Sequence, residues 1–467
     1  MPHICYLELE QLQAYGHHLN LIESILGDML DTGLFEGASF IGNAEIDETT
    51  RTRLGRLRFD DIFGETPRVH LPNEPNNIPA VADALRRAIG KIRADDIVLY
   101  SNMPSPYVLL AIALAASGIP AEKKLRFIVR LAMIDEEWTW FESRLSAIIN
   151  YISVTDTLRD RFLFTVESTR LQEYYQERTG YLFPIQFGPI SRTLVLTTQD
   201  KWRGYNPDRG PFNIAFLGEA REEKGFQHLP AFVEHLAAAL PTARFHIQCN
   251  ASSVNNTPSI VETRNRLVAL RDGDGPLRSR IVLYHSPLPH ALYQAVLSKA
   301  HCVLLPYLAE RYACRGSGVA FEGIQADSMI LVTGNTDLEV TFNLCPATIP
   351  FDFTVRNMAG PMPALVRTLK EQIDRKRQHP HDDLARCDHL LFSRMFFDIT
   401  SLARMPRDTL PYAASAAASA RLDRELQDLR QCSAEIGDKR HFECLFAVTK
   451  IPHGAAGQPD TSVPSRK

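Results

Sequence analysis

The chain has 467 residues, of which 45% are hydrophobic and 23% are charged, an ordinary balance for a globular protein of about two to three domains. Its formal net charge of −4 argues against a nucleic-acid-binding protein, whose basic face would show in that balance. The eight cysteines form no Cys-x-x-Cys pair, so zinc-site spacing is absent from the sequence and a disulfide framework is not expected.

The N-terminus carries no secretory signal pattern. Met1 to Glu8 lack a basic stretch followed by an apolar one, and the chain contains no run of about 18 apolar residues. We therefore expect a cytoplasmic protein without a transmembrane segment.

Short β-rich runs alternate with helical patterns through the first part of the chain. The runs predict strands at Ile4–Leu9, Ala38–Gly42, Arg68–Leu71, Asp96–Ser101, Leu125–Arg130 and Tyr151–Thr155. The helical periodicity predicts helices at His18–Leu30, Ile78–Ile92 and Tyr107–Ser117. Strands separated by helices are typical of βαβ units, which build a parallel sheet.

The same alternation restarts after a polar, turn-rich stretch at 198–211. Strands are predicted at Phe212–Gly218, Ala243–Cys249, Arg280–His285, His301–Pro306 and Met329–Thr333. Helices are predicted at Gly225–Leu240, Thr257–Leu270 and His290–Lys299. The restart predicts an α/β protein with two Rossmann-like domains, whose parallel sheets face each other across a cleft.

The expected domain limits follow from this pattern. One Rossmann-like domain is expected at 1–197, a linker at 198–211 and a second Rossmann-like domain at 212–390. Further helices are predicted at Ala364–Gln378, Leu391–Ala403 and Ala413–Gln431, the last two within a helical segment at 391–450. Residues 451–467 are expected to form a disordered tail.

A charged loop follows the first strand of the second expected domain. Gly218 ends the strand, Arg221 and Lys224 lie in the loop, and Gly225 opens the next helix. Because open α/β sheets bind ligands at the carboxyl ends of their strands, these two cations are candidates to neutralise a diphosphate. The alternative is a solvated helix start, which short charged runs commonly form.

A second loop, after the strand that ends in Pro306, carries Arg315-Gly316-Ser317-Gly318. The glycines allow a ligand to approach the backbone, and the N-terminus of the following helix, near Val319, suits a phosphate. Glu322, one turn into that helix, is placed to accept hydrogen bonds from ribose hydroxyls. The alternative is an ordinary turn, in which Ser317 caps the helix and Glu322 is a first-turn acid.

Together these segments resemble the retaining glycosyltransferases of the GT-B fold, the family 4-like group that includes sucrose synthases and bacterial mannosyltransferases. The resemblance spans roughly 212–339. It implies that the donor diphosphate is bound by Arg221, Lys224, Arg315, Gly316, Ser317 and Gly318. It also implies that Glu322 binds the donor ribose, and that a sugar is transferred without a metal ion and with retention of configuration.

The chain departs from the group's pattern at the end of the site that contacts the sugar. The group has a second glutamate eight positions before Glu322, where this chain has Cys314, and the nearest acid is Glu310. A Gly-His pair near the first helix of the group is similar to Gly16-His17-His18. We therefore take His17, His18 and Glu310 as candidate catalytic residues, although an exposed capping histidine is the alternative for the first two.

A further group of polar and aromatic residues follows the strand predicted at Leu125–Arg130. Arg130, Asp135 and Glu136 lie where acceptor contacts are expected, at the carboxyl end of a strand. Trp138 and Trp140 could stack on a sugar ring, with packing in the core or in a lid as the alternative.

The expected enzyme is a glycosyltransferase that moves a sugar from a nucleotide-sugar donor to a hydroxyl group of a glycan, a lipid or a small molecule. Cationic groups that stabilise the leaving diphosphate would make a metal ion or a cofactor unnecessary. Two alternatives stay open: a nucleotide-sugar epimerase of the same fold that uses His285, Glu310 and Glu322, and a degenerate subunit that binds a nucleotide sugar, as Cys314 suggests. Nucleic acid is not an expected partner, whereas a peripheral membrane contact stays open.

Overall fold

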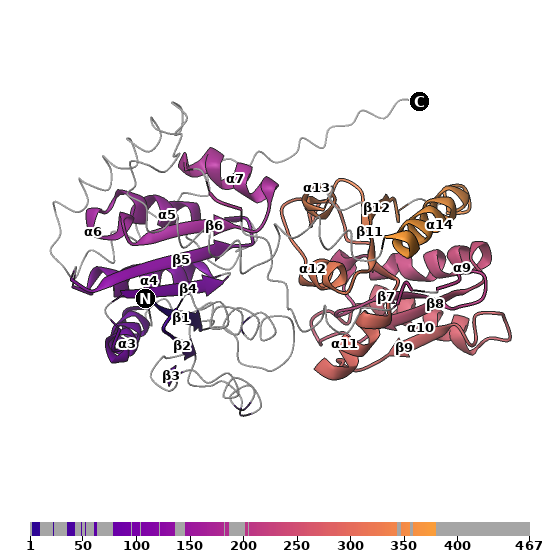
Figure 1. Ribbon diagram of the computed structural model, residues 1–467, viewed down its shortest axis with the longest axis horizontal. Coiled ribbons are helices and arrows are strands. Elements are labelled where there is room, and N and C mark those ends of the chain that lie inside the picture. The colour runs from indigo at the N-terminus through magenta and orange to yellow at the C-terminus, as the bar shows by residue number, and fades with distance from the viewer. Residues whose placement is uncertain are drawn as a thin grey trace, which may run out of the picture.

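The computed structural model describes residues 2–9, 22, 35–42, 48, 52, 60–62, 78–94, 96–102, 104–120, 122–135, 145–181, 183–185, 201–203, 205–342, 347–354 and 358–379. Their strands form two six-stranded sheets, which lie in two lobes side by side (Figure 1). We call the described residues up to 185 the first half and those from 201 onward the second half.

The first half is a parallel sheet in the order β3-β2-β1-β4-β5-β6. Its strands are β1 (His3–Glu8), β2 (Gly37–Gly42), β3 (Asp60–Ile62), β4 (Asp96–Asn102), β5 (Lys124–Leu131) and β6 (Phe162–Val166). Its helices are α3 (Ile78–Lys91), α4 (Pro106–Ser117), α5 (Leu145–Val154), α6 (Asp156–Arg159) and α7 (Thr169–Thr179). β1 and β6 are buried along their whole length, as is typical of parallel strands that are covered on both faces.

The second half is a parallel sheet in the order β12-β11-β10-β7-β8-β9. Its strands are β7 (Phe212–Phe216), β8 (Ala243–Gln248), β9 (Ile281–Tyr284), β10 (Cys302–Leu305), β11 (Met329–Thr333) and β12 (Thr348–Phe351). Its α-helices are α9 (Leu229–Ala239), α10 (Pro258–Asp272), α11 (His290–Lys299), α12 (Gly318–Gln325), α13 (Asp337–Thr341) and α14 (Met362–Gln378). Two short 3₁₀ turns, η4 (Glu222–Lys224) and η5 (Phe226–His228), lie between β7 and α9.

Both sheets have the same connectivity. In each, the strand that comes first in the chain lies in the middle, the next two extend to one side and the last three to the other. The direction of strand progression therefore reverses between β1 and β4 in the first half, and between β7 and β10 in the second. At such a reversal the loops that follow the two strands diverge and leave room for a ligand. The two loops that carry the predicted phosphate-binding residues follow β7 and β10.

The prediction of two parallel α/β sheets is confirmed, and each half has its own hydrophobic core. The predicted domain limits remain a prediction. Two residues of the expected linker, Trp202 and Tyr205, are buried in the second core, so this segment is anchored to the second half.

One strand prediction is wrong. Tyr151–Thr155 lies at the end of α5 and in the turn after it, and the strand of this region is β6. The buried residues Leu145, Ile148, Ile149 and Ile152 recur at the i, i+3, i+4, i+7 spacing of a helix face, which a short apolar run conceals. The segments predicted at Arg68–Leu71, Leu391–Ala403 and Ala413–Gln431, the helical segment at 391–450 and the tail at 451–467 lie outside the described residues, as does all of His18–Leu30 except Ile22.

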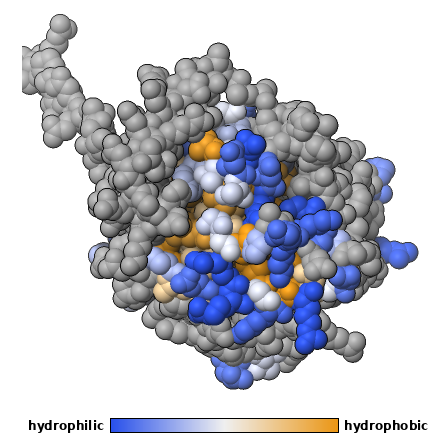
Figure 2. All heavy atoms as spheres, turned by 90° about the vertical axis from the view of Figure 1, so that its left-hand side faces the viewer, coloured by the Kyte–Doolittle hydropathy of each residue, from blue (hydrophilic) through white to orange (hydrophobic). Residues whose placement is uncertain are grey.

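Among the described residues that are visible on the face of the first half pointing away from the second, polar and apolar residues are mixed (Figure 2). The large hydrophobic residues that are exposed in the described part of the chain, Val254 and Leu292, both belong to the second half. Among the described helices, none is long and apolar enough to cross a membrane.

Candidate functional site

The loops after β7 and β10 are in direct contact. The backbone N–H of Leu308 donates to the carbonyl oxygen of Glu223 at 2.9 Å. A Cβ atom built on Gly225 would lie 1.7 Å from the carbonyl oxygen of Pro306, and the φ angle of Gly225 is +68°. Only glycine fits both the backbone conformation and the space at this position. The two predicted phosphate-binding loops therefore form one continuous surface at the strand reversal of the second sheet.

Lys224 directs its ammonium group back over the end of β7. A Cβ atom built on Gly218 would lie 3.0 Å from Lys224 Nζ. Within the described part of the chain, this partly buried ammonium makes no hydrogen bond and no ion pair. Burial, and next the nearby positive charge of Arg221, lower the pKa of Lys224 to about 8. The Glu223 and Glu219 carboxylates oppose this fall in pKa, but from beyond ion-pair distance. A desolvated cation with no hydrogen-bond acceptor, in a loop at the end of a strand, is the setting expected for an anion site.

Arg221 is held by two carboxylates of its own loop. Its Nε donates to Glu219 Oε2 at 2.8 Å, and its Nη1 donates to Glu223 Oε1 at 3.3 Å. Glu219 also accepts hydrogen bonds from Ser252 and Asn255. Partial burial favours the neutral acid, but these hydrogen bonds and the charge of Arg221 lower the pKa of Glu219 to about 2. The ion pairs hold the guanidinium within its own loop, and its role in binding a diphosphate remains a prediction.

Arg315 joins the same cluster from the other loop. Its Nη1 lies 3.8 Å from Glu223 Oε1, the atom that also accepts from Arg221. Its guanidinium carbon lies 5.9 Å from the centre of the Tyr312 ring. The predicted cations Arg221, Lys224 and Arg315 are therefore brought together from two separate loops.

Ser317 caps α12, as one of the alternatives proposed. Its side chain accepts from the backbone N–H of Ala320 at 3.4 Å, and its hydroxyl lies 3.3 Å from that of the buried Tyr307. The helix begins at Gly318, next to the cation cluster. Capping and phosphate binding are compatible, because an N-cap side chain satisfies one or two of the four free N–H groups of the first turn.

Glu322 faces α11 rather than standing free. Its carboxylate accepts a hydrogen bond from the hydroxyl of Tyr293, a residue that the sequence analysis did not single out. Burial, and next the charge of Glu322, raise the pKa of Tyr293 well above its usual value, so the phenol stays protonated and donates. Binding of the donor ribose by Glu322 remains a prediction.

The predicted catalytic residues are not gathered by the described structure. Glu310 is exposed on the loop between β10 and α12, and His17 and His18 lie outside the described residues. The catalytic role of all three stays a prediction. Cys314, which occupies the position of the group's second glutamate, is partly buried and packs against the core of the first half.

Of the residues predicted to follow β5, some are described by the structure and others are not. Asp135 accepts hydrogen bonds from the backbone N–H and the hydroxyl of Ser146, at 3.2 and 2.5 Å, and so fixes the start of α5. Glu136, Trp138 and Trp140 lie outside the described residues.

Arg130 is buried at the end of β5. Its Nη2 lies 3.3 Å from an oxygen of Glu167, and its Nη1 donates to Asn102 Oδ1 at 2.7 Å. The sequence analysis missed Glu167, which follows β6, because it did not recognise that strand.

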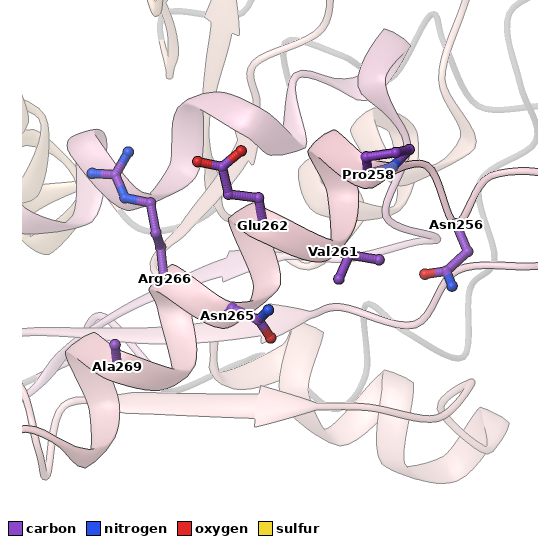
Figure 3. A pocket seen from close by; sticks show the side chains of 7 residues that line it. All are labelled: Asn256, Pro258, Val261, Glu262, Asn265, Arg266 and Ala269. Atoms are coloured by element: carbon purple, nitrogen blue, oxygen red, sulfur yellow. The ribbon is translucent and has the colours of Figure 1, made fainter.

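A separate surface hollow of about 630 Å³ runs along α10 and its leading loop (Figure 3). It is lined by Asn256, Pro258, Val261, Glu262, Asn265, Arg266 and Ala269. None of the clustered cations lines it. Among the described residues, no group of three or more histidine, cysteine, aspartate or glutamate side chains is placed to hold a metal ion.

No protein-family model and no curated protein matches the chain. Solved structures do match it over most of its length. A glycosyltransferase from Rickettsia africae shares 11% identity, with a TM-score of 0.58, 86% of this chain and 98% of that chain covered.

An α,α-trehalose-phosphate synthase from Burkholderia xenovorans shares 11% identity with a TM-score of 0.58, covering 87% of this chain and all of that one, 100%. Anabaena HepE shares 12% identity with a TM-score of 0.56, covering 86% of this chain and 99% of that chain. At such identities the likeness concerns the fold. The chain has the GT-B fold, with two parallel Rossmann-like sheets.

Proposed function

We propose that this protein is a glycosyltransferase that moves a sugar from a nucleotide-sugar donor to a hydroxyl group of an acceptor. The observation that carries the proposal is Lys224, a partly buried ammonium that has no partner in the described part of the chain and lies where two strand-end loops meet. Because this ammonium is desolvated and makes no hydrogen bond or ion pair there, a bound anion would stabilise it. The fold supports the choice of ligand, because the similar HepE structure holds UDP and glucose, and the Burkholderia synthase is of the UDP-forming kind.

The proposed chemistry is the departure of a nucleoside diphosphate from the donor sugar. As the glycosidic bond breaks, negative charge grows on the diphosphate and positive charge on the sugar ring. Lys224, Arg221 and the N-terminus of α12 would stabilise that negative charge, and a preorganised donor of this kind contributes about 3 to 4 kcal/mol. Arg221 suits the role because its ion pairs with Glu219 and Glu223 hold it in position before the donor arrives.

The finer assignments belong to the same proposal. The cation cluster takes the place of a metal ion, so transfer needs none, and the resemblance to the family 4-like group implies retention of configuration. Glu322 would bind the donor ribose through the carboxylate that already accepts from Tyr293. The acceptor would be a hydroxyl of a glycan, a lipid or a small molecule, with the reaction in the cytoplasm.

The epimerase alternative gains no support from the structure. His285 follows β9, whereas Glu310 and Glu322 follow β10. β9 and β10 are separated by β8 and β7, which places their ends three strand spacings, roughly 14 Å, apart in the sheet. Residues so placed do not converge on one carbon atom of a sugar.

The proposal is tested first by nucleotide binding. We expect UDP, GDP or ADP to bind the full chain in isothermal titration calorimetry, and Lys224→Met to weaken that binding by about 10- to 100-fold, as befits the loss of a charged contact. Lys370→Met, which changes an exposed lysine of α14, is the matched control and should leave the affinity unchanged.

Two outcomes contradict the proposal in different ways. If none of the three nucleoside diphosphates binds, the donor site is wrong. If donor binds but neither hydrolysis nor transfer of its sugar is detected with any acceptor, the chain is a degenerate nucleotide-sugar-binding subunit.

A further inference from the structure

We propose that Glu167, which belongs to the first half, is a positioning residue of the donor site in the second half. Its carboxylate seats against Gly316 and holds the Arg315–Gly318 loop in the position that receives the donor phosphates. The identity of the ligand rests on the proposed function, whereas the contact is a property of the chain itself.

The contact between Glu167 and Gly316 leaves no room for a side chain. A Cβ atom built on Gly316 would lie 1.7 Å from Glu167 Oε1, 2.4 Å from its Cδ and 2.8 Å from its Cγ. The backbone of Gly316 does not have a positive φ angle. Glycine is therefore required here for space, not for conformation.

Within the first half, Glu167 is fixed in place by a buried ion pair with Arg130. It is 7% exposed, and its Oε2 lies 3.3 Å from Nη2 of Arg130, which is 3% exposed and donates to Asn102. Burial raises the pKa of Glu167, and the charge of Arg130 acts against that rise. A buried ion pair adds little net stability because desolvation offsets its attraction. What the pair does supply is a fixed place for the Glu167 carboxylate.

Arg170 forms a second contact with the same loop through hydrogen bonds to backbone carbonyl oxygens. Its Nη1 donates to the carbonyl oxygens of Ala313 and Asn335, at 3.4 and 2.7 Å. Ala313 comes shortly before Gly316 in the loop, and Asn335 lies in the turn before α13. Arg170 belongs to the first turn of α7, which contacts α13 across the boundary between the lobes (Figure 1). The start of α7 thus holds the loop that follows β10 and the turn that precedes α13.

The contact reaches both phosphate-binding groups of the loop. Arg315 and Ser317 are the chain neighbours of Gly316; the first joins the cation cluster and the second caps α12. A displacement of Gly316 moves both. Docking of the first half and binding of a diphosphate then favour the same loop position, so each strengthens the other.

A double-mutant cycle across the two halves tests the proposal. Gly316→Ala adds a methyl group where Glu167 lies, and we expect it to weaken UDP binding about 10- to 50-fold in calorimetry. In a Glu167→Ala background, which removes the obstacle, the same change should cost less than about 3-fold. Glu167→Gln keeps the obstacle and should give no such rescue. Gly275→Ala, at a site where a Cβ meets nothing within 4 Å, is the control.

Hydrogen–deuterium exchange of peptides that cover 167–172 and 313–318 gives a readout independent of the ligand. Exchange should rise in Gly316→Ala and return toward the wild-type level in Gly316→Ala/Glu167→Ala. An equal loss of UDP affinity in all three backgrounds, or no loss at all, overturns the proposal. If the wild-type protein binds no nucleoside diphosphate, the proposed function fails, while the exchange cycle still decides whether Glu167 and Gly316 hold the halves together.

Discussion

An ammonium group that leaves water without gaining a hydrogen bond or an ion pair costs free energy, and Lys224 is in this position within the described part of the chain. Burial and the charge of Arg221 lower its pKa to about 8. A bound diphosphate would compensate both effects, because its negative charge favours the protonated ammonium. Binding of the diphosphate would then offset the desolvation cost of the ammonium.

This reasoning predicts a pH dependence of nucleotide binding. At pH 7 most of the ammonium is charged in the free protein, and at pH 8 about half is, so the affinity for UDP should fall only about 2-fold between pH 7 and pH 8. Above pH 8 the free protein loses the proton that the complex needs, and the affinity should fall roughly 30-fold by pH 9.5. Isothermal titration calorimetry between pH 7 and pH 9.5 measures this, because the terminal phosphate of UDP is already largely ionised at pH 7.

Lys224→Arg is the matched variant for this experiment. Arginine keeps its charge up to a far higher pH, so the affinity of the variant should vary little over the same range. A decline of equal steepness in the wild type and in Lys224→Arg would show that another group causes it.

At the scale of elements, α14 is tied to the turn before β11 by a buried ion pair. Lys376 and Asp327 are 1% and 0% exposed at their side chains, and Lys376 donates to Asp327. Asp327 has a φ angle of +56°, in the left-handed region that aspartate and asparagine tolerate better than other residues with a side chain. The pair thus joins a turn of unusual geometry to a helix.

Lys376→Met should lower the free energy of unfolding by about 3 kcal/mol, because it removes the ammonium that faces a buried carboxylate. Adding Asp327→Asn should recover about 1 kcal/mol or more, since the amide is neutral and keeps the backbone geometry. Urea denaturation measures both. Arg377→Met, at an exposed neighbour on the same helix, should stay within about 0.5 kcal/mol of the wild type, and an equal loss there would point to a general effect on α14.

The sequence predicted the elements of the second half well, since buried parallel strands such as β10 and β11 are short apolar runs between helical patterns. It also located the two cation-bearing loops, because ligand loops follow the carboxyl ends of strands. It did not predict how Arg221 is held by Glu219, or that Tyr293 donates to Glu322. Those contacts join side chains whose closeness depends on the packing of separate elements.

Glu167 was not predicted as a site residue for a different reason. The apolar run at Tyr151–Thr155 predicts a strand where the structure has the end of α5. The sequence therefore does not predict β6, or that Glu167 lies at its carboxyl end. A residue whose partners are Arg130 in one half and Gly316 in the other has no local pattern that marks it.

For the whole molecule, the boundary between the halves contains a second buried acid. Asp337, at the start of α13, is 0% exposed and faces the start of α7. Burial raises its pKa to about 7; Glu167 adds to the rise, whereas Ser168 and Arg170 oppose it. The folded protein therefore holds a proton at Asp337 that the unfolded chain releases near pH 4.

The stability that this proton contributes is present below pH 4, is lost as the pH rises toward 7 and is constant above 7. Asp337→Asn, which mimics the neutral acid, should therefore be more stable than the wild type at pH 8, by up to about 4 kcal/mol, and the difference should shrink toward pH 4. Thermal unfolding from pH 4 to pH 8 measures it. Asp274→Asn, at an exposed aspartate, is the control, and a wild-type-like profile for Asp337→Asn would contradict the prediction.

The burial of Trp202 has a practical consequence for anyone who wishes to express the second half separately. Its indole Nε1 donates to the carbonyl oxygen of Asp327 at 2.8 Å, and the neighbouring Lys201 donates to Ala300 and Ser328. A fragment cut just before β7, where the strand pattern restarts, would remove these side chains and open the base of the remaining core to solvent. The cut belongs upstream of Lys201, among residues that the strand pattern alone would assign to neither half.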